Sequence, residues 1–129
     1  MSSFRLYFGL AAFAGFSGVG LGAFGAHALR DKLEPLAMSV YKTGVEYQMW
    51  HALALALIAI QIQSAGPSRL LLWAARLMAC GIVLFSGSLY CLSITGVHRL
   101  GMLTPFGGAA FLVAWLMLGI YSCRFRGKN

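Results

Sequence analysis

The side chains best suited to chemistry in this 129-residue sequence are its three histidines and the polar residues beside them. Each histidine lies at an end of a long apolar segment, and all three are expected on one side of a membrane. A neutral imidazole is a common ligand for metals and haem iron, and a nearby carboxylate can carry protons. The candidate ligand-binding residues are His27, Glu46, Tyr47, Gln48, His51 and His98.

These residues allow several kinds of site. His27 and His51 could bind haem, a metal or a quinone headgroup, or could carry protons together with Glu46. Alternatively, the same side chains form a hydrogen-bonded cap that ties the helix ends together. No His-x-x-x-His or Glu-x-x-His pair fixes a metal geometry on one helix, so we predict no metal site. Haem and quinone stay open as cofactors.

Residues that could support catalysis or transport are few. The sequence shows no nucleophile beside a base, no phosphate-binding loop and no paired carboxylates at a catalytic spacing, so we predict that the protein is not an enzyme. A transporter or channel needs a polar path across the membrane. Apart from Arg76, the apolar segments offer only a few amides and hydroxyls, and the long stem of Arg76 can carry its guanidinium to the headgroups.

The composition points to the bilayer. The chain is 60% hydrophobic and 10% charged, with a net charge of +7. The basic residues are scattered around the ends of apolar segments rather than gathered on one helix or loop, which argues against nucleic acid as a partner. The three cysteines form no Cys-x-x-Cys pair, and we expect them to be buried as small apolar side chains.

Four apolar segments must position the candidate residues. We predict an all-α fold, an integral membrane bundle of four transmembrane helices, in a single domain over residues 1–129. The predicted spans cover residues 5–27, 46–63, 70–95 and 103–123. Between the first two spans, Pro35 could start a short interfacial helix whose apolar residues lie on the membrane surface.

The distribution of Lys and Arg predicts the orientation. One side carries Arg5, Arg69, Arg76, Arg124, Arg126 and Lys128, and the other carries Arg30, Lys32, Lys42 and Arg99. The positive-inside rule therefore places both termini in the cytoplasm. Ala26-His27-Ala28 has the form of a signal-peptide cleavage site, but the apolar stretch before it exceeds the about 7–15 residues of a signal core, so we expect no cleavage.

The first span carries small residues at helical spacing. Gly15, Gly18, Gly22 and Gly25 recur every three or four residues, and Gly18-x-x-x-Gly22 is a motif that lets two membrane helices approach closely. The face could form a seam with a second copy. We favour packing inside the same bundle, because this chain has other helices to cover it.

Two stretches of the sequence resemble a known family. "GLGAFGAHAL" at the end of the first span and "YKTGVEYQMWHALAL" at the start of the second are similar to the YgdD/YwdK-like family of small uncharacterised four-helix inner-membrane proteins. "GSLY" and "TPFGG" in the second half also fit this family. The resemblance implies a multi-pass protein of the bacterial inner (plasma) membrane and implies no enzyme activity, substrate or cofactor.

Small size, short loops and glycine faces favour a non-enzymatic role. We expect an accessory or packing subunit of a larger membrane complex, with the lipid bilayer and either that complex or a homo-oligomer as partners. A quinone or haem site at the His27/His51 end is the first alternative, and a small transporter or channel is the second.

Overall fold

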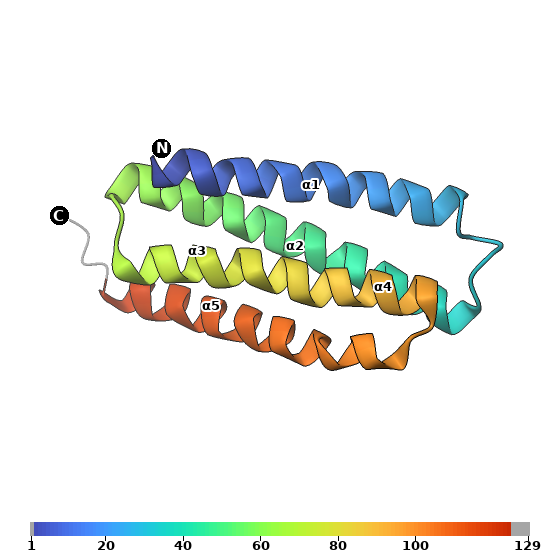
Figure 1. The fold of residues 1–129 in the computed structure, drawn as a ribbon. Coiled ribbons are helices and arrows are strands. Elements are labelled where there is room, and N and C mark those ends of the chain that lie inside the picture. The colour runs from blue at the N-terminus through green and yellow to red at the C-terminus, as the bar shows by residue number, and fades with distance from the viewer. Residues whose placement is uncertain (1, 125–129) are drawn as a thin grey trace.

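The apolar segments form a bundle of long antiparallel helices in the computed structural model, which describes residues 2–124 (Figure 1). The elements are α1 (Ser3–His27), α2 (Pro35–Ala65), α3 (Arg69–Gly81), the π-helix η1 (Ile82–Ser86), α4 (Gly87–Thr95), the 3-10 helix η2 (His98–Met102) and α5 (Thr104–Arg124). Four segments are long and apolar enough to cross a membrane, namely Ser3–His27, Pro35–Ala65, Arg69–Thr95 and His98–Arg124. The predicted all-α bundle of four spans is confirmed.

The bundle has two chemically different ends (Figure 1). The start of α1, residues 66–68 and the end of α5 lie together at one end, which we call the terminal end. Residues 28–34 and 96–103 lie at the other, which we call the loop end. All three acids of the chain, Asp31, Glu34 and Glu46, belong to the loop end or to the helical turns next to it.

The second helix is longer than its predicted span. Pro35 starts a helix, as expected, but this helix continues without a break to Ala65 and has 31 residues. The separate interfacial helix predicted at this point is therefore wrong. A helix of this length extends about 46 Å, which exceeds the roughly 30 Å of a hydrocarbon core. Nothing in the sequence between Pro35 and Gly66 breaks the helix, because no further proline or turn motif interrupts it.

The third span is not a regular α-helix. Residues Ile82–Ser86 form a π-helix between α3 and α4, in the middle of an otherwise continuous segment. The span begins at Ser68, whose hydroxyl accepts a hydrogen bond from the Leu71 amide at 3.2 Å. It ends at Gly96, whose φ of 70° is a left-handed conformation that glycine adopts without strain.

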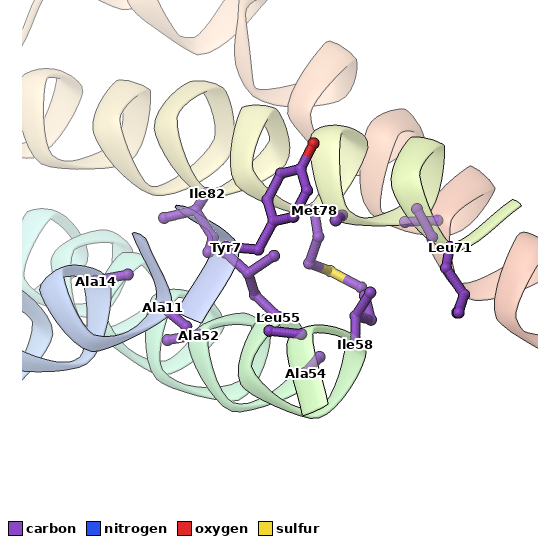
Figure 2. Close-up of a cluster of buried hydrophobic side chains, with 14 of the residues drawn as sticks. Tyr7, Ala11, Ala14, Ala52, Ala54, Leu55, Ile58, Leu71, Met78 and Ile82 are labelled. Atoms are coloured by element: carbon purple, nitrogen blue, oxygen red, sulfur yellow. The ribbon is translucent and has the colours of Figure 1, made fainter. Parts of the chain in front are cut away.

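The core lies where α1, α2, α3 and α5 contribute small and branched side chains. Figure 2 shows Ala11 and Ala14 of α1, Leu55 and Ile58 of α2 and Met78 of α3 converging in one cluster. Leu55, Ile58 and Met78 are at most 1% exposed. Small residues on α1 let the helices approach closely enough to exclude lipid, which is how membrane helices gain packing contacts.

The two flanking helices are α1 and α5, and each leaves much of its surface to lipid. Phe16 on α1 is 81% exposed and Leu112 on α5 is 73% exposed. All three cysteines are also exposed on the outer surface of the bundle, so the expectation that they are buried is wrong. The inner helices α2 and α3–α4 carry most of the polar contacts described below.

Candidate functional site

Two polar clusters lie on adjacent faces of α2, near the middle of the bundle. The Gln48 cluster consists of Ala14, Ser17, Tyr41, Gln48 and Tyr90. The His51 cluster consists of Tyr47, His51, Phe85, Phe111 and Trp115. Gln48 and His51 are three residues apart, which leaves their side chains about 60° apart around the α2 axis, and each contacts a different set of neighbours.

Gln48 joins three helices through its side-chain amide. The side chain is 5% exposed, and its Nε2 donates hydrogen bonds to the Ala14 carbonyl at 2.8 Å and to the Ser17 hydroxyl at 2.9 Å. The Tyr90 hydroxyl donates to Gln48 Oε1 at 2.7 Å. Gln48 thus uses both of its donors and one acceptor position to connect α1, α2 and α4. A polar side chain at this depth needs such partners, because lipid offers none.

Glycines on α1 allow this helix to pack closely against α2. A Cβ atom at Gly18 would lie 2.6 Å from Met49 Sδ and 3.3 Å from Gln48 Nε2, and a Cβ at Gly22 would lie 3.3 Å from Val45 Cγ1. A Cβ at Gly25 would overlap the ring of Tyr41. Three of the four predicted packing glycines therefore lie against α2 of the same chain. Gly15 is the exception, since nothing lies within 4 Å of its Cβ position.

His51 is enclosed by aromatic rings and is 7% exposed. Its ring stacks on Phe111 with the centroids 3.6 Å apart and an interplanar angle of 13°. Tyr47, one turn earlier on α2, stacks on Phe85 with the centroids 4.5 Å apart. The imidazole therefore forms part of an aromatic seam that joins α2, the π-helix and α5.

The hydrogen bonds of His51 define its tautomer. Nδ1 lies 2.7 Å from the Tyr47 carbonyl oxygen, and the Trp115 indole N–H donates to Nε2 at 3.2 Å. A carbonyl can only accept and an indole N–H can only donate, so the neutral ring with its proton on Nδ1 satisfies both contacts. Both ring nitrogens therefore make hydrogen bonds within the protein.

The π-helix fits the third span to α5. A Cβ atom at Gly107 would overlap the backbone of Phe85, and a Cβ at Gly81 would lie 2.5 Å from the ring of Phe111. Two glycines therefore allow α5 to approach the third span where the aromatic seam crosses it. On the other side of the same segment, the Ser86 hydroxyl donates to the Gly44 carbonyl at 2.7 Å.

The predicted outer cluster of histidines does not assemble. His27, Glu46 and His98 are exposed, whereas His51 is buried deeper in the bundle. The end of α1 lies beside Tyr41, and His51 follows ten residues later on α2, about 15 Å along the helix axis. The structure thus brings together Tyr47 and His51 on one side and Gln48 with α1 on the other, and it keeps His27 apart from both.

The described residues contain no group of three or more His, Cys, Asp or Glu side chains that could hold a metal ion.

The open space beside the Gln48 cluster is a groove of about 340 Å³ between α1 and the third span. Gln48, Ser17 and Tyr90 line it together with apolar side chains. Every buried side-chain nitrogen and oxygen in the described part of the chain has a hydrogen-bond partner.

Sequence reasoning missed several members of the two clusters. Tyr90 and Ser17 carry no local signal, because each is a single hydroxyl in an apolar helix whose partner lies on another helix. Trp115 and Phe111 lie at helical spacing and are equally typical of core or lipid-facing residues. The short motif around Gly107 is the one local hint, since consecutive glycines in a membrane helix indicate a close contact.

Comparisons with known proteins find relatives that are named as membrane proteins. The family described as "Protein of unknown function (DUF423)" matches residues 21–108. The UPF0382 membrane protein YwdK of Bacillus subtilis is 45% identical over 107 residues, which cover 83% of this chain and 87% of the relative. The UPF0382 inner membrane protein YgdD of Escherichia coli is 40% identical over 128 residues, which cover 99% of this chain and 95% of the relative. No solved structure matches the chain.

Proposed function

This chain belongs to the family described as "Protein of unknown function (DUF423)", and its relatives YwdK and YgdD are named only as membrane proteins, so we propose a function from the geometry of the chain. We infer a non-enzymatic packing subunit that binds laterally to a membrane-spanning helix of a larger complex. The inferred binding surface is the outer face of α1.

One observation carries this proposal. Gly9, Phe13, Phe16 and Gly20 fall at positions i, i+4, i+7 and i+11 of α1, which places them on one stripe opposite the face that packs on α2. Phe13 is 69% and Phe16 81% exposed, and nothing in this chain lies within 4 Å of a Cβ at Gly9 or Gly20. His27 falls at the end of the same stripe.

The glycines of this stripe have no packing role within the bundle. A glycine inside a helix destabilises it by about 1 kcal/mol relative to alanine. At Gly18, Gly22 and Gly25 the close approach of α2 offsets that cost. At Gly9 and Gly20 a helix from another protein would do the same, with Phe13 and Phe16 filling the spaces on either side.

Purification from the native membrane in a mild detergent tests the proposal. We expect the protein to be recovered with a second membrane protein, and Gly20→Leu to abolish that recovery without changing the thermal stability of the isolated bundle. Gly119→Leu on α5 is the matched control, because nothing lies near its Cβ position either. Recovery only as a monomer or a homo-oligomer contradicts the proposal, as does an equal loss in the Gly119 variant.

The groove beside Gln48 supports a second candidate, a site for a small lipid-soluble ligand. Gln48 Oε1 accepts one hydrogen bond from Tyr90 and has a second lone pair, whereas both of its donors are used. A ligand whose hydroxyl donates a hydrogen bond to Gln48 Oε1, such as a quinol, therefore fits better than haem. Mass spectrometry of lipids extracted from the purified protein tests this, and extracts free of quinone and quinol would rule it out.

We also propose that both termini face the cytoplasm. Arg5, Arg69, Arg76 and Arg124 belong to the terminal half of the bundle, where the sequence has no acid, and Arg126 and Lys128 lie outside the described residues. A fluorescent-protein fusion at the C-terminus should be bright, and an alkaline phosphatase fusion should be inactive. The opposite pair of results would reverse the orientation.

A further inference from the structure

The terminal end holds a basic cavity between the start of α3 and the end of α5. The cavity has a volume of about 330 Å³ and is lined by Ser68, Arg69, Leu70, Tyr121 and Arg124. Its two arginines come from different helices and are both exposed. The acids of this chain all lie toward the loop end, so the described part of the terminal end contains no carboxylate side chain that could neutralise them.

An apolar cavity adjoins the basic one. It measures about 440 Å³, lies between α2 and α5, and is lined mainly by aliphatic and aromatic side chains. Tyr121 lines both cavities, and the neighbours Leu70 and Leu71 line one each. From Tyr121 the apolar cavity extends along α5 to Trp115, about 9 Å further into the bundle by helix rise.

This pair of cavities matches the two parts of a lipid. We propose that it binds one anionic phospholipid, with the phosphate held by Arg69 and Arg124 and one acyl chain in the apolar cavity. A guanidinium donates paired hydrogen bonds to phosphate oxygens, whereas a lysine ammonium acts as a compact charge without this paired geometry. Two arginines without a nearby carboxylate favour a headgroup with a net negative charge over a zwitterionic one.

The acyl chain distinguishes a phospholipid from a free phosphate. An apolar cavity open toward the bilayer leaves its lining atoms without contacts unless something fills it, and a hydrocarbon tail supplies those contacts. Leu57 and Leu118 on facing sides of the cavity are suited to such a tail. The site is separate from the outer stripe of α1, so it does not depend on the proposed packing function.

Thermal unfolding of the full chain in detergent, with added lipid, tests the proposal. Phosphatidylglycerol should raise the melting temperature in a saturable way, whereas phosphatidylcholine and inorganic phosphate at the same concentrations should not. Arg69→Gln and Arg124→Gln should each weaken the apparent affinity about fivefold, the effect expected for one cation near an anionic headgroup. Arg69→Lys, which retains the charge but loses the paired hydrogen bonds, should fall between them and the parent.

Two matched controls make the outcome specific. Arg99→Gln removes an exposed arginine at the loop end and should leave the affinity unchanged. Leu118→Trp fills the apolar cavity and should weaken phosphatidylglycerol binding, whereas Leu116→Trp, at a position 64% exposed on the outer surface of α5, should not. Equal stabilisation by inorganic phosphate or phosphatidylcholine overturns the proposal. So does an Arg99 effect as large as that of Arg69.

Discussion

Gln48→Met isolates the energetic role of the central amide. Methionine has nearly the length and flexibility of glutamine but cannot donate or accept these hydrogen bonds. The substitution removes the two bonds from Nε2 to α1 and the bond from the Tyr90 hydroxyl to Oε1. The Ala14 carbonyl still accepts its backbone hydrogen bond within α1, whereas the Tyr90 hydroxyl loses Gln48 Oε1 as its acceptor.

The expected loss follows from the number of bonds. Hydrogen bonds between membrane helices contribute about 0.6 kcal/mol each on average, because the unfolded helices also find partners in the membrane. Three bonds therefore give a destabilisation of about 2 kcal/mol for Gln48→Met. Tyr90→Phe removes only one of the three and should cost about 0.6 kcal/mol. In a double-mutant cycle the pair should show a coupling of about the same size.

Unfolding in mixed micelles by increasing the fraction of sodium dodecyl sulfate, followed by far-ultraviolet circular dichroism, measures these free energies. Gln63→Met is the control, because Gln63 is exposed at the end of the same helix and should tolerate the change. A stability of the Gln48 variant equal to that of the parent would refute the reasoning. A coupling near zero with Tyr90 would show that the hydroxyl and the amide act independently.

Three further substitutions probe the rest of the bundle by the same unfolding assay. Gly107→Ala should destabilise the bundle by about 3 kcal/mol, because the added Cβ meets the backbone of Phe85. Gly119→Ala should be tolerated, because nothing lies near its Cβ position, and equal effects of the two substitutions would contradict the Gly107 contact. His51→Phe keeps an aromatic ring but loses two hydrogen bonds, so a loss of about 1 kcal/mol is expected, and an unchanged stability would contradict a stabilising role for these two hydrogen bonds. His27→Ala should change stability by less than about 0.5 kcal/mol, since the side chain is exposed; a larger loss would show that it supports the fold.

The sequence was sufficient to predict the number of spans and one of the packing faces. Long uncharged segments can only be helices in a membrane, so the four spans follow from hydropathy alone. The glycine spacing on α1 predicted a close contact, and Gly18 and Gly22 do lie against α2. Such features depend on residues near one another in the chain, which is why they can be recognised without a structure.

The arrangement of the site depends on how deep each residue lies in the bundle, and this depth is harder to predict from the sequence. The three histidines were expected together because they share one side of the membrane, but His51 lies about three helical turns along α2 from the end of α1 that carries His27. The continuous α2 helix moves His51 away from His27, since the residues before Glu46 add turns instead of a loop. Tyr90 and Trp115 could not be assigned, because their partners are set by how the helices pack.

The π-helix explains how one span serves both clusters. Phe85 and Ser86 are adjacent, yet Phe85 joins the aromatic seam with Tyr47 whereas Ser86 bonds the Gly44 carbonyl beside the Gln48 cluster. A π-helix changes the angular position of every residue that follows it, so Tyr90 can reach Gln48 while Phe85 stays against α5. Phe85 contacts the aromatic seam from within the π-helix, whereas Tyr90 contacts Gln48 about one turn beyond it.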